Sequence, residues 1–219
     1  MSKHTWEIKI DNSFGINFKC HMWHDEIKNK DFSSIINFAK QNIISKNLHI
    51  ADFKHEGTYW DKYNLFVEMK KDKTIQYIKK CIKQSYKNFL KSIKAKEEEI
   101  WINGWLNVMT KGMHLQKHCH ANHKHAYLSG NITLTKTKTS NTSFLIPNFN
   151  SPTQYEIYNV NNKLGHFNLF PQWVYHWVKP IEEDLRIVLG FDLNCKKAMD
   201  YYWKHNADTN WPIKWSIKL

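Results

Sequence analysis

Five of the 13 histidines are concentrated in one short stretch: His114, His118, His120, His123 and His125. If the chain is extended here, His118 and His120 lie on the same face of a strand, because side chains alternate between the two faces. Two imidazoles on one face can bind a single metal ion, and imidazole suits Fe, Zn, Cu and Ni. A solvated histidine-rich loop explains the same stretch without a metal, so the pair predicts only part of a site.

A third histidine follows turn residues further along the chain. Gly165, Pro171 and His176 are spaced six and five residues apart, which places His176 just after a glycine turn, a short strand and a proline turn. A lone histidine in such a place is more often a satisfied core residue than a ligand. Combined with His118 and His120, it predicts the third member of a three-point metal site.

The chain contains a single arginine, Arg186, among 32 basic residues. Arg186 begins an alternating run ten residues after His176, in which Arg186, Val188 and Gly190 share one face. The polar residues 179–185 between His176 and Arg186 predict a turn, so we expect these two residues on successive antiparallel strands. A guanidinium on an inner face would be buried and would need an anion, either a protein carboxylate or a ligand.

The elements that must position these residues are short strands after residue 99. The β-rich runs are Trp101–Met109, Tyr127–Lys138, Ser143–Ile146, Gln154–Val160, Gly165–Phe170, Val174–Val178 and Arg186–Leu193. Short strands at this spacing, separated by turn residues, are typical of a sandwich or barrel. Before them, Trp6–Ile10 and Gly15–Phe18 alternate like strands, and Ser33–Ser45 and Asp72–Ile93 have helical periodicity.

No linker, repeat or low-complexity segment divides the chain. We therefore predict an α+β protein with a single domain over residues 1–219. Residues 1–99 would form a mixed helical and strand support, residues 100–195 the β core that carries the site, and residues 196–219 a tail packed on the core. Trp211, Pro212 and Trp215 would anchor that tail.

Several motifs of the predicted core form a recognisable set: Trp105-Leu-Asn107, Gly112, His118-x-His120, Leu128-Ser129-Gly130, Leu169-Phe170-Pro171, His176 and Arg186. The set resembles the double-stranded β-helix oxygenases that use Fe(II) and 2-oxoglutarate, and more narrowly the 2-oxoglutarate/Fe(II) oxygenases of bacteria and their phages. The resemblance covers roughly residues 100–195, with a looser match before them. It implies a jelly-roll, cupin-like double-stranded β-helix core backed by N-terminal helices.

The resemblance also implies an activity and a set of site residues. His118 and His176 match the two iron-binding histidines, and Arg186 matches the residue that binds the distal carboxylate of 2-oxoglutarate. Further co-substrate contacts are expected from Asn107, Ser129 and Asn131. With O2 as second co-substrate, the implied reaction is hydroxylation of an unidentified prime substrate, with 2-oxoglutarate converted to succinate and carbon dioxide.

His120 departs from the family pattern, because most of these enzymes have an aspartate there. Residues 100–155 contain no Asp or Glu, so no acidic residue close to His118 in sequence replaces it. Either His120 completes a metal and catalytic triad with His118 and His176, or water or chloride takes the third position. Three neutral ligands would leave the metal more positive and favour an anionic co-ligand such as a 2-oxo acid.

Two other functions fit parts of the pattern. Three-histidine cupin-type dioxygenases share this spacing and act without 2-oxoglutarate; in that interpretation His125 stands near the position of the usual cupin glutamate. Arg186 favours the 2-oxoglutarate enzyme. A non-enzymatic metal-binding barrel with a basic nucleic-acid-binding surface is the other alternative. The roles of His123 and His125, whether lid contacts or solvated residues, stay open.

Composition excludes several other classes. With 42% hydrophobic and 15% aromatic residues, the chain is not intrinsically disordered. No apolar run is long enough to span a membrane, and no secretory signal or glycine-rich phosphate loop is present. The net charge of +12 suits an acidic partner or nucleic acid, although the lysines are spread along the chain. Four scattered cysteines without a CxxC pair indicate a cytoplasmic protein.

Overall fold

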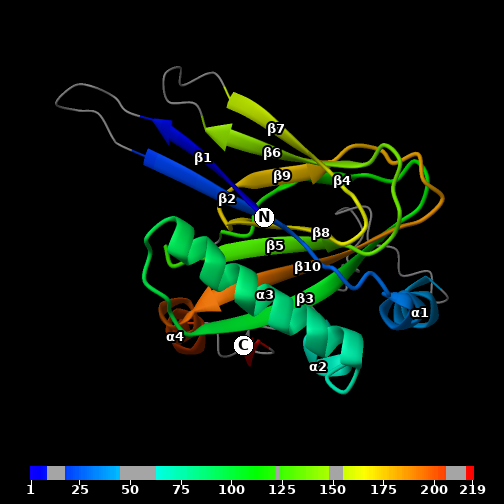
Figure 1. Ribbon diagram of the computed structural model, residues 1–219, viewed down its shortest axis with the longest axis horizontal. Helices are drawn as coiled ribbons and strands as arrows, with labels where there is room; N and C mark the ends of the chain where they lie inside the picture. Colours follow the sequence, from blue (N-terminus) through cyan, green and yellow to red (C-terminus); the bar gives the residue numbers. More distant parts are fainter. Residues whose placement is uncertain (9–17, 45–62, 122–123, 148–154, 206–215) are drawn as a thin grey trace.

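The computed structural model describes residues 1–8, 18–44, 63–121, 124–147, 155–205 and 216–219. Two antiparallel sheets lie face to face, with helices on the outer side of the larger one (Figure 1). Among the described residues, none of the helices is both long and apolar enough to cross a bilayer.

The larger sheet has seven strands. In spatial order they are β1 (Ser2–Ile8), β2 (Phe18–Glu26), β8 (His166–Pro171), β5 (Leu128–Thr133), β10 (Arg186–Cys195), β3 (Ile100–Met109) and β11 (Ile217–Lys218). The smaller sheet has four, in the order β4 (Leu115–His118), β9 (Tyr175–Val178), β6 (Asn141–Pro147) and β7 (Tyr155–Asn161). Strands that alternate between two facing sheets enclose an interior into which side chains from both can project.

Strand β10 shows how the sequence sorts side chains between core and interior. Ile187, Leu189 and Phe191 point to the outer side and join the main hydrophobic core. Arg186 and Val188 alternate with these residues along the strand. They therefore face the space between the sheets, because successive side chains of a strand point to opposite faces. The expected alternation over this run is confirmed, and Arg186 is buried, with 2% of its surface exposed.

Helices cover the outer face of the larger sheet. They are α1 (Ser33–Asn42), α2 (Leu65–Glu68) and α3 (Lys73–Ser92), and their apolar residues belong to the same core cluster as the outward residues of the sheet. Asp72 is the N-cap of α3: its carboxylate accepts a hydrogen bond from Ile75 N at 2.9 Å. Helix α4 (Lys196–His205) follows β10 directly.

The strands differ from the sequence-based expectation at three places. The run expected over 127–138 forms only the six residues of β5. At the N-terminus β1 begins at Ser2, four residues before the expected run over 6–10, whose last two residues lie outside the described part of the chain. The run expected over 15–18 lies outside the described residues except for Phe18, where β2 begins; β2 pairs with β8, so the N-terminal segment extends the larger sheet. His176 and Arg186 do lie on successive strands, but β9 and β10 belong to different sheets. The two strands therefore do not pair with each other as a hairpin.

The expectation of a tail anchored by Trp211, Pro212 and Trp215 lies outside the described residues. The division of the chain at residues 99 and 195 stays a prediction. The short final strand β11 pairs with β3 in the larger sheet, at Ile217 opposite Ile102.

Candidate functional site

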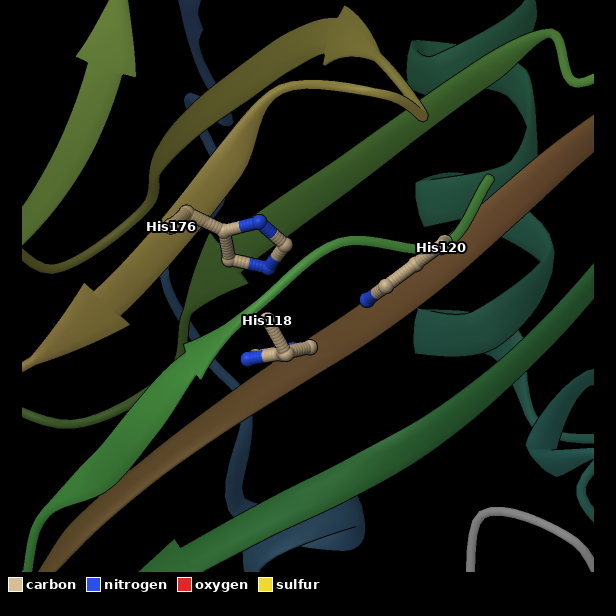
Figure 2. Close-up of side chains that lie close together, drawn as sticks. All are labelled: His118, His120 and His176. Carbon is tan, nitrogen blue, oxygen red and sulfur yellow. The ribbon is translucent and has the colours of Figure 1, made fainter. Parts of the chain in front are cut away.

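Three histidine side chains, from or next to strands β4 and β9, lie close together (Figure 2). His118 is the last residue of β4, and His176 is its register partner on β9. His120 lies beyond the end of β4, where its backbone N–H donates to Gln172 O at 2.9 Å. One ring nitrogen from each histidine lies within 4.8 Å of one from each of the others. The structure thus brings together all three predicted metal ligands.

Hydrogen bonds to backbone carbonyls orient the rings of His118 and His176 in the same sense. The Nδ1 atom of His118 lies 2.8 Å from Gln116 O, and that of His176 lies 3.1 Å from Val174 O. Because a carbonyl oxygen only accepts, Nδ1 of each ring must carry the proton, which places the lone pair on Nε2. A neutral imidazole with a lone pair on Nε2 is the form that binds a metal ion.

Burial keeps these histidines in that neutral form. Desolvation, together with the neighbouring His120, lowers the pKa of His118 to about 4. Desolvation is also the main cause that holds the pKa of His176 well below its usual value, followed by His118 and His120. At neutral pH both rings are therefore unprotonated and able to bind a cation.

Aromatic side chains enclose the histidine cluster. The ring of Phe170 lies edge-on to His176 at 4.9 Å between centroids, and the ring of Trp105 lies 5.5 Å from His120. Trp105 occupies the space above Gly190, where an added Cβ would come within 3.0 Å of the indole. The absence of a side chain at Gly190 therefore lets Trp105 approach His120.

An acidic residue that sequence reasoning missed lies beside His120. Asp192 Oδ1 on β10 is 2.7 Å from His120 Nδ1, and the Ser129 hydroxyl donates to the same carboxylate oxygen at 2.5 Å. The alternation of β10 places Asp192 on the inner face, which was a usable signal, but its distance in sequence from His120 hid the contact. Ser129, whose expected role in co-substrate binding stays a prediction, contacts Asp192 and His120.

Arg186 is the first residue of β10 and lies on the same inner face as Asp192, six residues further along the strand. Its Nη1 donates to Met109 Sδ at 3.2 Å, and its buried Nε has no hydrogen-bond partner among the described residues. With the Asn162 amide turned to satisfy its neighbours, Asn162 Oδ1 accepts from Nη2 at 3.1 Å. No described carboxylate lies within 4 Å of the guanidinium, so its charge is available to an anionic ligand.

The nearest acidic influence on Arg186 comes from Glu183. This carboxylate raises the pKa of Arg186, but desolvation outweighs it and lowers that pKa to about 10, so the guanidinium stays charged at neutral pH. Glu183 is itself bound elsewhere: its Oε1 accepts three backbone N–H groups, of Lys138, Thr139 and Ser140. These bonds lower the pKa of Glu183 to about 2, against the opposing effect of desolvation. Glu183 therefore does not form a contact ion pair with Arg186.

Two predicted asparagines add polar groups on the inner face of the larger sheet. Asn107 pairs with Val188 and Asn131 pairs with Gly190, so both lie along the part of β10 that separates Arg186 from Asp192. Among the described residues, neither the Asn107 amide nor Asn131 Nδ2 has a hydrogen-bond partner. Together with Arg186 Nε, they present unpaired donors to the interior.

The orientation of Asn131 is set by a chain of hydrogen bonds across the sheet. Asn168 Nδ2 donates to Asn131 Oδ1 at 2.7 Å, and Asn168 Oδ1 lies 2.5 Å from His24 Nδ1. His24 Nε2 in turn lies 3.2 Å from the Tyr158 hydroxyl. Desolvation, opposed by the Asn168 bond, lowers the pKa of His24 to about 4, so the ring is neutral and donates from Nδ1. This polarity leaves Asn131 Nδ2 as the end that is available for a ligand.

The other histidines of the cluster are not brought to the site. His114 is exposed at the start of β4. The ring of His125 packs edge-on against Tyr201 of α4, with 5.9 Å between centroids, which does not support a ligand role in a cupin-like site. His123 lies outside the described residues.

The fold can be compared with known structures, although no family model and no curated protein sequence matches this chain. A prolyl-4-hydroxylase from Pseudomonas putida aligns with a TM-score of 0.54 and 11% identity, covering 80% of this chain and 88% of the other. A Trichoplax adhaerens prolyl hydroxylase, solved with a hypoxia-inducible-factor peptide fragment, aligns with a TM-score of 0.54 and 12% identity over 80% and 84%.

A third similar structure is SnoK, a non-haem α-ketoglutarate-dependent carbocyclase from nogalamycin biosynthesis. It aligns with a TM-score of 0.52 and 10% identity over 80% of this chain and 79% of the other. These alignments show the 2-oxoglutarate/Fe(II) oxygenase fold, with its double-stranded β-helix core, and confirm the predicted α+β class.

Proposed function

We propose that this protein is an Fe(II)- and 2-oxoglutarate-dependent dioxygenase that hydroxylates a prime substrate. One observation carries the proposal: three histidines with metal-binding tautomers lie close together, and a buried arginine on the inner face of β10 has no contact carboxylate among the described residues. The fold is one that uses this combination, and the Arg186 Nε has no hydrogen-bond partner among the described residues.

The histidine cluster fits a divalent metal ion. His118, His120 and His176 would supply three neutral nitrogen ligands, each with Nδ1 in a hydrogen bond and the lone pair on Nε2, and imidazole is a suitable ligand for Fe(II). Three protein ligands leave coordination positions for a co-substrate and O2. The hydrogen bonds at Nδ1 fix the rings before the metal arrives, which lowers the entropic cost of binding.

The Arg186 end of the interior fits the distal carboxylate of 2-oxoglutarate. A buried guanidinium with an unpaired Nε can form a charge-assisted bond to a carboxylate, which is about twice as strong as a neutral hydrogen bond. Asn107 and Asn131 would donate to the same ligand between Arg186 and the histidines. The three neutral histidines also leave the site favourable to an anionic co-substrate.

The residues of the chain would therefore bind the metal ion, orient the co-substrate and shield both from water. Fe(II) with O2 would supply the oxidation of 2-oxoglutarate to succinate and carbon dioxide and the transfer of one oxygen atom to the prime substrate. Phe144 and Phe170 pack beside His176 and exclude water from that side. Trp105 covers His120.

An anaerobic titration tests the proposal. Metal-free protein receives Fe(II) and then 2-oxoglutarate while the visible absorption is recorded. A weak charge-transfer band that requires both additions supports bidentate binding of the 2-oxo acid at the iron. Iron binding without such a band would favour the three-histidine cupin-type dioxygenase, which the neutral triad also suits. No iron binding would contradict both activities.

The prime substrate is to be identified by succinate release. The similar structures include two prolyl hydroxylases, one of them solved with a peptide fragment, and one carbocyclase, so peptides and small metabolites are both to be screened. Because the net charge of +12 suits acidic molecules, nucleic acids belong in the same screen. Four free cysteines, of which Cys20 is deeply buried, support a reducing compartment such as the cytoplasm.

A further inference from the structure

Among the described residues, the group formed by His118, His120 and His176 lacks the carboxylate ligand that non-haem iron sites with two histidines usually contain. A carboxylate nevertheless contacts one of the three histidines, on the ring nitrogen that would not bind the metal: Asp192 Oδ1 lies 2.7 Å from His120 Nδ1. Among the described residues, Asp192 is not part of the group whose ligand atoms lie within 4.8 Å of one another. It therefore reaches the site through the His120 ring.

We propose that Asp192 is a positioning residue that holds His120 in its metal-binding tautomer and supplies, through that ring, the negative charge that a direct carboxylate ligand would provide. The inference rests on the proposed function, because it assumes that His118, His120 and His176 bind the metal ion.

The polarity of the hydrogen bonds supports this role. An ionised carboxylate only accepts, so His120 Nδ1 must donate to Asp192 and the lone pair must lie on Nε2. The Ser129 hydroxyl, 2.9 Å from the same Nδ1, also donates to Asp192 Oδ1 and so offers Nδ1 only its oxygen lone pairs. Both neighbours of Nδ1 therefore select the same tautomer.

His120 needs this support more than the other two histidines. His118 and His176 lie on paired strands, and backbone carbonyls only two residues away orient their rings. His120 lies beyond the end of β4, and its ring is oriented by a residue of another sheet. Asp192 is well placed for this task, because β10 is flanked by β3 and β5, with Asn103 and Ser129 as register partners of Asp192.

Asp192→Asn tests the role by metal affinity. Co(II), whose visible absorption reports coordination, is titrated into metal-free protein. Loss of the carboxylate is expected to weaken Co(II) binding by about 10- to 100-fold, the usual effect of removing such a partner of a histidine ligand. Asp200→Asn, which removes an exposed carboxylate paired with Lys196 on α4, is the matched control and should change affinity less than about twofold.

A charge-swap series separates this role from a merely structural one. In His120→Asp, two carboxylates would face each other, so Co(II) affinity should fall below that of the wild type. Adding Asp192→Asn removes the repulsion, so the double variant should bind Co(II) more tightly than His120→Asp alone. Asp192→Asn is thus expected to weaken Co(II) binding in the wild-type background and to strengthen it in the His120→Asp background.

A purely structural Asp192 would give the same loss in both backgrounds, and that result would overturn the inference, as would an Asp192→Asn variant with wild-type affinity. Thermal unfolding of each metal-free variant shows whether the fold is retained. If wild-type protein binds no Co(II) or Fe(II), the proposed function fails first; if it binds and only the Asp192 effects are missing, the inference alone fails.

Discussion

His118 and His176 are register partners on the neighbouring strands β4 and β9, and their ring centroids lie 4.3 Å apart. Strand pairing places two of the three proposed ligands side by side, and nearby backbone carbonyls orient their rings. The third, His120, depends on side-chain and loop contacts. Variants at the three positions should therefore differ in how they affect the metal site and the fold.

Replacing His118 or His176 by Ala should weaken Fe(II) and Co(II) binding by more than about 100-fold, because loss of a direct ligand exceeds the effect of an outer contact. Anaerobic calorimetry measures the affinity. His114→Ala, an exposed histidine just before β4, should leave it unchanged. Metal affinity that survives both substitutions would show that the metal is bound elsewhere.

Arg186→Gln should separate co-substrate binding from metal binding. Removing the charge is expected to weaken 2-oxoglutarate binding by about 10- to 100-fold, the loss of one charge-assisted contact of about 1.5–3 kcal/mol. Metal affinity should change less than about threefold, because the contacts of Arg186 are to Met109 and Asn162 and not to the histidines. An equal loss of both affinities would mean that Arg186 only supports the fold.

Asn131→Ala should reduce 2-oxoglutarate affinity more modestly, by roughly 3- to 10-fold, since a neutral hydrogen bond contributes about 1 kcal/mol. Asn168→Ala should have a smaller effect of the same sign, because Asn168 only orients the Asn131 amide. Asn88→Ala on α3 serves as the control. If Asn168→Ala weakens binding more than Asn131→Ala does, the orienting role is wrong.

The metal-free protein should lose stability as the pH falls from about 6.5 to about 4. In the unfolded chain His24 has a pKa near 6.5, whereas burial lowers it to about 4 in the folded protein. Between these values the unfolded state binds a proton that the folded state excludes, so stability is complete above the range and declines within it.

For His24 alone the decline is on the order of 2–3 kcal/mol. Unfolding midpoints in urea, measured at several pH values, should show a shallower pH dependence for His24→Asn, whose amide can still donate to Asn168. His118 contributes in the same range and direction, so the variant should retain part of the slope. An unchanged slope would contradict a neutral, buried His24.

Gly190→Ala should disturb the site through Trp105. The new Cβ would lie 3.0 Å from two atoms of the indole, so the ring must shift away from its place beside His120. Overpacking of this kind costs about 1–3 kcal/mol, which differential scanning calorimetry measures. The double variant Gly190→Ala with Trp105→Phe should recover part of the loss, because the smaller ring makes room. A wild-type melting temperature for Gly190→Ala would show that the indole moves freely.

The types and spacing of residues were sufficient to predict much of this protein. Helical periodicity located α1 and α3, and alternation located most of the later strands and assigned Arg186 to the buried inner face. Resemblance added the double-stranded β-helix, which the structural comparisons confirm. These features are readable because periodicity and burial pattern are local properties of the chain.

Only the tertiary structure decided which distant residues meet. The sequence showed no acidic residue close to His118, yet the folded chain brings Asp192 of β10 against His120 from the other sheet. The tertiary structure also places β9 and β10 in different sheets and connects His24, Asn168 and Asn131 by hydrogen bonds. Alternation tells which face a side chain occupies, but the pairing of strands far apart in sequence determines what it faces there.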